Sequence, residues 1–234
     1  MLRLSLAASI AALTIGATAS HAQDTYGSVF GSVSQYADSP SLSGNVQTPA
    51  GNNRQSVVID SDNGNGFGVA IGRSFGDYRG FNLRGEVELS FSNQDADNTF
   101  FSGNDAVQGG GPEANTQGSV DTTRLFLNGY ADFETDSAWP PYIGAGLGVS
   151  QAEFDVSYGP GIALTDTSEQ FAAQLIAGTS YDLGGGYALF GDVRYIRDFD
   201  VETRRFAPDG STVTGTIADD IDTVAINLGV SFRF

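Results

Sequence analysis

Two short runs of charged residues are the parts of this 234-residue sequence best suited to chemistry. Arg84, Glu86 and Glu88 alternate with other residue types in one run, and Asp192 and Arg194 do so in another. Carboxylates can transfer protons in catalysis, or they can form hydrogen-bonded ion pairs with guanidinium groups. A spacing of two residues places side chains on the same face of a β-strand. We therefore expect these charges to line the polar faces of strands.

The composition removes most of the catalytic chemistry that such acids could support. The sequence has no Cys and no Lys, and its single His, His21, lies in an N-terminal segment that we expect to be cleaved. A mature chain of this kind has no His-activated nucleophile, no Ser–Lys pair and no thiolate metal site. Catalysis by carboxylates alone, as in glycosidases, stays open. Because Arg residues match the acids in these runs, we predict no enzyme and no catalytic residue, cofactor or metal site.

Two motifs imitate known ligand sites. Residues 144–148 resemble a dinucleotide-binding loop, but the third Gly comes too early and no helix is expected after it. Residues 60–64 resemble the start of a calcium loop, but Asn65 and Ile71 stand where an EF-hand needs Gly and Glu. We therefore predict neither a nucleotide site nor an EF-hand, while loose calcium binding stays open.

The first 22 residues are typical of a secretory signal peptide. Arg3 supplies the positive start, residues 4–19 form an apolar stretch rich in Ala, Leu and Ile, and Ser20-His21-Ala22 forms a small-x-small cleavage site. A membrane anchor is the alternative, but the apolar stretch is short and Ala-rich. We expect a cleaved signal peptide over residues 1–22 and an exported domain over residues 23–234.

Polar and apolar residues alternate through the rest of the sequence. In residues 81–92, Phe81 and Leu83 fall on one face, and Arg84 falls on the other. Segments of about ten residues with this alternation are typical of outer-membrane β-strands. In the first segment, which is ambiguous, we favour Val29 and Val33 on the apolar face. The alternating segments are residues 26–36, 67–75, 81–92, 124–133, 142–152, 171–181, 187–199 and 223–234.

Short and long connections alternate between these segments. The short ones are residues 76–80, 134–140 and 182–186. The long ones, at about 37–64, 93–122, 155–167 and 197–220, are rich in Asp, Asn, Gly, Ser and Pro. Bacterial outer-membrane barrels combine short periplasmic turns with long extracellular loops. The predicted fold class is therefore all-β: an eight-stranded antiparallel up-and-down transmembrane β-barrel with that arrangement of loops.

The cost of placing charge in lipid decides which face of the strands points outward. A lipid-facing Arg near the midplane costs about 2–4 kcal/mol, so we expect the apolar face to contact lipid. Eight strands leave an interior that side chains just fill, and buried charges there need partners. A structural plug is the favoured interpretation, with an ion path or gate as the alternative. We predict a lumen ion-pair network of Arg84, Glu86, Glu88, Arg124, Asp132, Asp192, Arg194 and Arg233.

Several segments resemble strands of a known family. Trp139, Pro140, Pro141 and Tyr142, with the glycines that follow at 144, 146 and 148, look like the PYxGxGxG strand of the small outer-membrane β-barrel family, which includes the OmpA transmembrane domain and the opacity-type proteins. Residues 171–178 with Tyr181, and then residues 193–195, are similar to its sixth and seventh strands. Residues 228–234 resemble its last strand, including the terminal aromatic residue.

The resemblance implies a barrel in a Gram-negative outer membrane. It also implies insertion by the barrel-assembly machinery, with Phe232 and Phe234 as the assembly signal. It implies no single activity, because members serve as structural proteins, adhesins and surface antigens. The sequence given ends at Phe234, so we expect no peptidoglycan-binding domain and carry over no cell-wall tethering.

Charge and aromatic residues suggest the partners. A net charge of −17 argues against nucleic acid, which needs a basic footprint. Most of the charged residues in the long connections are acidic. They would keep the surface soluble, and they could also attract divalent cations that bridge to lipopolysaccharide. We expect contact with outer-membrane lipid and lipopolysaccharide, while the sequence does not identify an extracellular ligand. Aromatic residues near the short turns predict a periplasmic-side girdle of Trp139, Tyr142, Tyr181 and Tyr187.

These observations together predict a non-enzymatic, surface-exposed outer-membrane barrel. Its expected role is structural or in surface interaction, with acidic extracellular loops and a lumen filled by side chains. A narrow or gated pore for small solutes or ions is the alternative, because charged residues on the inward face could also line a path.

Overall fold

A computed structural model describes residues 25–48, 51–61, 63–103, 111–113, 116–158, 162–207 and 212–234, so the predicted signal peptide lies outside the described residues. No α-helix suited to crossing a bilayer occurs in these ranges. The strands are β1 (Thr25–Tyr36), β2 (Ser41–Thr48), β3 (Gly51–Ser61), β4 (Gly64–Tyr78), β5 (Phe81–Gly103), β6 (Gly111–Glu113), β7 (Gln117–Phe133), β8 (Pro141–Tyr158), β9 (Ile162–Gly184), β10 (Tyr187–Phe206) and β11 (Val213–Arg233).

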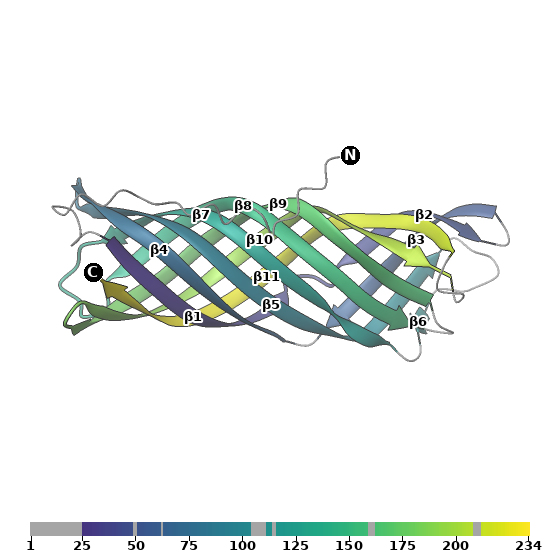
Figure 1. Cartoon of the computed structure of the whole chain (residues 1–234), viewed down its shortest axis with the longest axis horizontal. Coiled ribbons are helices and arrows are strands. Elements are labelled where there is room, and N and C mark those ends of the chain that lie inside the picture. The colour runs from purple at the N-terminus through teal and green to yellow at the C-terminus, as the bar shows by residue number, and fades with distance from the viewer. Residues whose placement is uncertain are drawn as a thin grey trace.

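Eight of these strands close into a hydrogen-bonded ring (Figure 1). The order around the ring is β1, β4, β5, β7, β8, β9, β10 and β11, and β11 pairs with β1 to close it. Every pairing is antiparallel, as expected for strands that follow one another along the chain. The predicted eight-stranded antiparallel barrel is confirmed.

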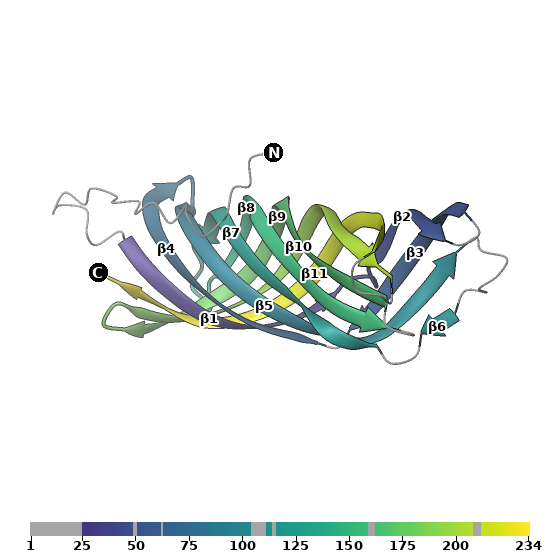
Figure 2. The ribbon, with the colours of Figure 1, turned by 45° about the vertical axis from the view of Figure 1, so that its right-hand side comes forward.

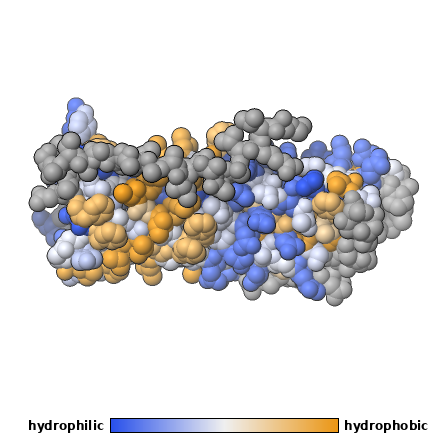
Figure 3. All heavy atoms as spheres, in the orientation of Figure 1, coloured by the Kyte–Doolittle hydropathy of each residue, from blue (hydrophilic) through white to orange (hydrophobic). Residues whose placement is uncertain are grey.

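Side chains alternate between the two faces of the ring. Leu147, Phe171 and Leu228 project from the outer face, where Leu147 is 73% exposed. On the visible side in Figure 3, hydrophobic residues gather over the half that carries the C-terminus, and hydrophilic residues cover the half that carries β2, β3 and β6. Val29 and Val33 are each 50% exposed on the outer face of β1, which confirms the expected facing.

The long connections contain further β-structure that the sequence did not lead us to expect. β2 and β3 form a hairpin inserted between the far ends of β11 and β5: Val46 lies opposite Gly215, and Val57 lies opposite Phe101. β5 and β9 each run for 23 residues, well beyond the lipid belt. The barrel wall therefore continues outward past the membrane, with β2 and β3 in place of β1 and β4 (Figure 2).

The inward face changes from polar to apolar along the barrel. Within the membrane half it carries charged and amide side chains, whereas beyond that half it carries an apolar cluster that we call the upper core. The interior of the upper half is therefore mainly apolar, although Gln55, Thr203 and Arg205 are also buried there. The upper core consists of Leu42, Val46, Val57, Ile59, Ala96, Val120, Ala152, Phe154, Val156, Leu164, Val201, Ile217 and Ile221.

A β-bulge in β10 lies where the inward face changes from polar to apolar. The pairing with β11 shifts between Asp198 and Val201, and Asp200 adopts a φ of 51°, in the left-handed region that few side chains occupy. The amide of Asp200 donates to a carboxylate oxygen of Asp220 at 3.0 Å, which satisfies the bulged backbone. Because the bulge adds one residue, both Asp198 and Val201 point inward.

Candidate functional site

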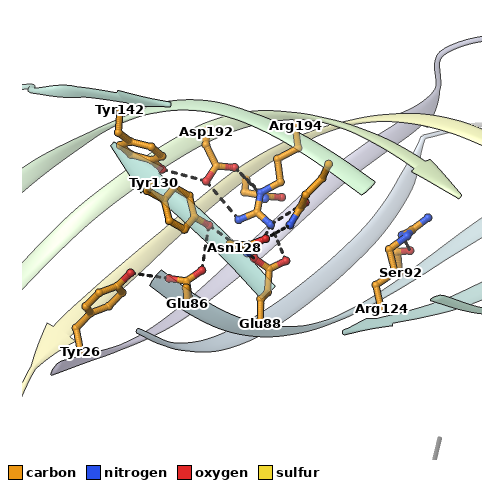
Figure 4. Close-up of polar contacts among 12 residues, drawn as sticks. Tyr26, Glu86, Glu88, Ser92, Arg124, Asn128, Tyr130, Tyr142, Asp192 and Arg194 are labelled. Atoms are coloured by element: carbon orange, nitrogen blue, oxygen red, sulfur yellow. Dashed lines mark hydrogen bonds and ion pairs between the residues drawn. The ribbon is translucent and has the colours of Figure 1, made fainter. Parts of the chain in front are cut away.

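The centre of the lumen is a buried cluster around Arg194 of β10 (Figure 4). Its guanidinium donates to Glu88 of β5 at 2.6 Å and to Asp192 at 2.9 Å. The Arg194 side chain is only 4% exposed, and the two carboxylates are as deeply buried. This arrangement ties opposite walls of the barrel together with charge-assisted hydrogen bonds.

Neutral donors complete the hydrogen bonding of these two carboxylates. Asn128 donates to Glu88 at 3.0 Å, while Tyr142 and Asn227 each donate to Asp192 at 3.0 Å. One guanidinium faces two carboxylates, so these donors share the task of stabilising the second negative charge. The cluster is therefore a closed polar core rather than a wide aqueous channel.

A second group lies nearer the C-terminal end of the barrel. Arg84 forms a fork with Asp132 through hydrogen bonds of 2.7 and 2.8 Å. The same guanidinium lies over the rings of Tyr26, Tyr130 and Tyr142, closest to Tyr130 at 4.5 Å. An inward Gly144 makes room for the Tyr130 ring, since a Cβ there would lie 2.5 Å from it. These contacts add cation–π attraction to the ion pair.

Glu86 differs from the other lumen acids because it takes its hydrogen bonds from tyrosines. The hydroxyls of Tyr26 and Tyr130 each donate to its carboxylate at 3.0 Å. Among the described residues, no guanidinium forms an ion pair with Glu86. The lumen network predicted from the sequence therefore lacked the tyrosines that hydrogen-bond to Glu86.

A third group lies on the extracellular side of the Arg194 cluster. Arg124 of β7 pairs with Asp198 of β10 at 2.6 Å, and both side chains are buried. Our sequence interpretation placed residue 198 at the end of the strand segment 187–199 but also within the long connection from 197, and it left Asp198 out of the lumen network. That omission is wrong because β10 continues past the lipid belt and the bulge follows Asp198 instead of preceding it.

The structure does not bring Arg233 into these pairs. It lies exposed at the C-terminal end of the barrel, and no ion pair of the described residues includes its side chain. Its backbone amide donates to the carbonyl of Gly186 in the neighbouring turn. Although Arg233 has the inward parity of β11, its position at the end of the strand leaves it at the barrel mouth.

A cavity of about 400 Å³ occupies this end of the lumen. Arg84, Asp132, Tyr142 and Arg194 line its depth, while Asp77, Glu134 and Arg233 lie at its rim. A hydrogen bond with Asp77 raises the pKa of the Glu134 carboxyl, and the charge of Asp77 acts in the same direction. Asp192 and Arg194 belong to the lining of this cavity, and the upper core lies beyond the Arg124 pair.

The predicted aromatic girdle needs one correction. Trp139 and Tyr181 pack against each other outside the barrel with ring centroids 4.8 Å apart, and Tyr187 is also exposed. Tyr142 is wrongly placed in the prediction: it is only 4% exposed and donates to Asp192 inside the lumen. Its even number in β8 gives it the inward parity of Gly144, which the prediction overlooked.

The C-terminal aromatic residues lie on the outer surface. Phe232 and Phe234 are both exposed, with ring centroids 6.0 Å apart. The amide of Phe234 donates to the carbonyl of Thr25 at 3.2 Å, so the chain end contacts the first strand. These two residues are accessible on the folded barrel, and their role in assembly stays a prediction.

The extracellular wall carries both paired and unpaired charge. Arg204 forms a fork with Asp166 at 2.7 and 2.9 Å. Partial burial raises the pKa of Asp166, but hydrogen bonds from Arg204 and the Thr167 amide outweigh it and hold the pKa below its usual value. Asp121 and Glu153 lie directly opposite each other on β7 and β8 and are exposed. No group of three potential metal-binding residues occurs in the described ranges.

A closed ring with an apolar belt outside and a charged core inside defines a transmembrane β-barrel of the bacterial outer membrane. The chain belongs to the family described as outer membrane protein beta-barrel domain, whose model matches residues 6–234. The protein is accordingly an integral protein of the cell outer membrane.

The chain is also similar to individual proteins of known sequence or structure. The chain is 29% identical over 182 residues to the outer membrane protein PagN of Salmonella typhimurium, and the match covers 72% of each chain. It is similar to the crystal structure of OprG from Pseudomonas aeruginosa, with a TM-score of 0.53, 18% identity, and coverage of 92% of this chain and 97% of that one. Neisserial surface protein A gives a TM-score of 0.49 at 16% identity, covering 90% and 97% of the two chains.

Sequence reasoning missed one charged residue on the lipid-facing surface. Arg73 of β4 has the same outward parity as Ile71 and Phe75, which are both exposed. A lipid-facing Arg costs about 2–4 kcal/mol at the midplane and about 0–1 kcal/mol near the interface. The alternation of residues 67–75 already contains this signal, since the only charged residue of that segment falls on its apolar face.

Proposed function

We propose that this protein is a non-enzymatic, sealed outer-membrane barrel that acts through its extracellular surface. The upper core, which includes Phe154, Leu164 and Ile217, is the observation that carries the proposal. Ions and polar solutes need a wetted path, and tightly packed apolar side chains deny them one. The extracellular wall is then the part of the molecule that is free to meet a partner.

The charge of that wall favours a cationic partner. Asp121 and Glu153 are exposed cross-strand neighbours, and like charges at such positions repel each other. Asn93 donates to Asp121 at 2.8 Å but adds no positive charge. A basic surface or a divalent cation would relieve this repulsion, whereas an anionic polysaccharide would increase it.

Binding by intact cells tests this proposal. Gram-negative cells that display the protein should bind to polylysine-coated surfaces more strongly than cells without it, and they should not bind to heparin-coated surfaces. Added salt should weaken the binding because it screens exposed charges. The double variant Asp121→Asn/Glu153→Gln should bind less, while Asp77→Asn, at the opposite end of the barrel, should bind normally. Equal binding by displaying and non-displaying cells would contradict the proposal.

The second candidate is a narrow pore, and the cavity of about 400 Å³ is the observation that favours it. Such a cavity would admit water and small solutes from the periplasm. Passage across the membrane would also require opening the Arg194 cluster and the upper core, which together contact several strands. The sealed barrel is therefore the stronger proposal.

A further inference from the structure

The lipid-facing surface of β4 carries a cation whose charge nothing in the described chain neutralises. The outward positions of β4 around it are apolar: Ile71 precedes Arg73 on the same face, and Phe75 follows it. The described ion pairs use other arginines, and the Nε of Arg73 is shielded from solvent without a hydrogen-bond partner. A charge in this setting needs a partner from outside the chain.

The position of Arg73 along the strand indicates the depth of this charge. β4 ends at Tyr78, five residues further on, in the turn that leads to β5. With a rise of about 3.3 Å per residue and a strand tilt of about 40°, the Arg73 backbone lies roughly 13 Å above that turn. An extended Arg side chain can lean toward the interface, so its guanidinium can reach the headgroups of the periplasmic leaflet.

Small residues lie side by side on the strands next to Arg73. Arg73 lies opposite Gly85 of β5, and Gly85 lies opposite Gly129 of β7. Gly129 in turn lies opposite Ala145 of β8. A Cβ on Gly129 would have no heavy atom within 4 Å, so the surface there is open. The ring of Phe75 covers Gly85, since a Cβ there would lie 3.0 Å from the ring, so the open part of this trough begins at Gly129. The trough offers an apolar bed beside the charge.

We propose that Arg73 and this trough bind a phospholipid of the periplasmic leaflet. The guanidinium donates a fork of hydrogen bonds to the phosphate diester, which suits the planar geometry of Arg better than that of Lys. One acyl chain lies along Gly129 and Ala145, against the ring of Phe75. Free phosphate carries the same acceptor group, but it has no acyl chain to occupy the trough and does not enter the apolar belt.

Native mass spectrometry of the folded barrel in a phosphate-free alkyl maltoside tests this site. The wild type should retain one phosphatidylglycerol per barrel, and Arg73→Leu should weaken that binding at least tenfold. Arg73→Lys should fall between them because it keeps the charge and loses the fork. Arg79→Leu is the matched control, since this Arg lies in the same hairpin, against the Tyr78 ring, outside the trough. Heat-modifiable gel mobility confirms that each variant is folded.

Three results would overturn the proposal. The first is equal retention of phosphatidylglycerol by the wild type and Arg73→Leu. The second is equal retention of a diacylglycerol with the same acyl chains, which would assign binding to the trough alone. The third is displacement of the lipid by millimolar inorganic phosphate, which would make the site one for free phosphate. A narrowed trough in Gly129→Leu should also weaken lipid binding, and normal binding by that variant would argue against an acyl chain there.

Discussion

Replacing Arg194 by Met should destabilise the barrel more than any change to an exposed ion pair. Arg194 forms ion pairs with both Glu88 and Asp192, and all three side chains are at least 96% buried. Removing one member of a buried ion pair costs about 3–5 kcal/mol, because it leaves an uncompensated charge. At about 1.4 kcal/mol per factor of ten, the ratio of folded to unfolded protein should fall by roughly two to four orders of magnitude.

A surface pair provides the matched control for this substitution. Arg204 is 51% exposed in its fork with Asp166, and exposed pairs contribute about 0–1 kcal/mol. Arg204→Met should therefore change stability little. The double variant Arg194→Met/Glu88→Gln should recover part of the loss, since Asp192 keeps its bonds from Tyr142 and Asn227.

Equilibrium urea unfolding in phospholipid vesicles measures these differences. Trp139 is the single Trp of the chain and lies exposed at the end of the barrel, so its fluorescence reports transfer from lipid to water. The free energy of unfolding of Arg194→Met should fall by several times the change for Arg204→Met. Equal changes for the two variants, or no recovery in the double variant, would refute the reasoning about buried charge.

The remaining predictions concern the upper core, the extracellular wall and the chain end. Phe154→Ala should lower the stability of the upper barrel by about 3–5 kcal/mol. Added protease should then cleave the extracellular strands. The membrane half should keep its heat-modifiable gel mobility. Because the pKa of Asp166 is lowered in the folded state, its carboxylate should stabilise the fold at pH values above its unfolded-state pKa, and this contribution should be lost as the pH falls through the folded-state pKa. In Arg204→Met, NMR titration should find the pKa of Asp166 closer to its ordinary value. Deleting Phe234 should reduce the folded fraction in cell membranes, whereas Phe234→Tyr should assemble normally; efficient assembly of the deletion would remove the proposed role.

The membrane half of the fold could be predicted because lipid imposes a strict rule on it. A shift of one residue would exchange Arg84 and Glu88 with their apolar neighbours, so the alternation defines both the strands and their facing. The same rule applied residue by residue would have placed Tyr142 in the lumen and Arg73 on the lipid face. Tyr142 was placed in the girdle because it is an aromatic residue near a turn, and Arg73 was given no place. The parity of each residue in its strand was not considered.

The upper half could not be predicted in the same way, because its pattern is the inverse. Leu42 and Val46 point inward there, while polar neighbours face water, and this pattern lies in a segment whose Gly, Ser and Asn content is typical of loops. The bulge at Asp200 also changes the parity of β10, so counting by twos from Arg194 places Val201 on the wrong face. The pairing of Arg124 with Asp198 depends on that long-range register, which only the three-dimensional structure supplies.

Single-channel recording in planar bilayers tests the sealed lumen most directly. Purified, folded protein should produce no stepwise currents, because the Arg194 cluster and the upper core interrupt the lumen. Regular, voltage-stable current steps from the wild-type barrel would show a continuous water-filled path and would contradict the sealed-barrel account.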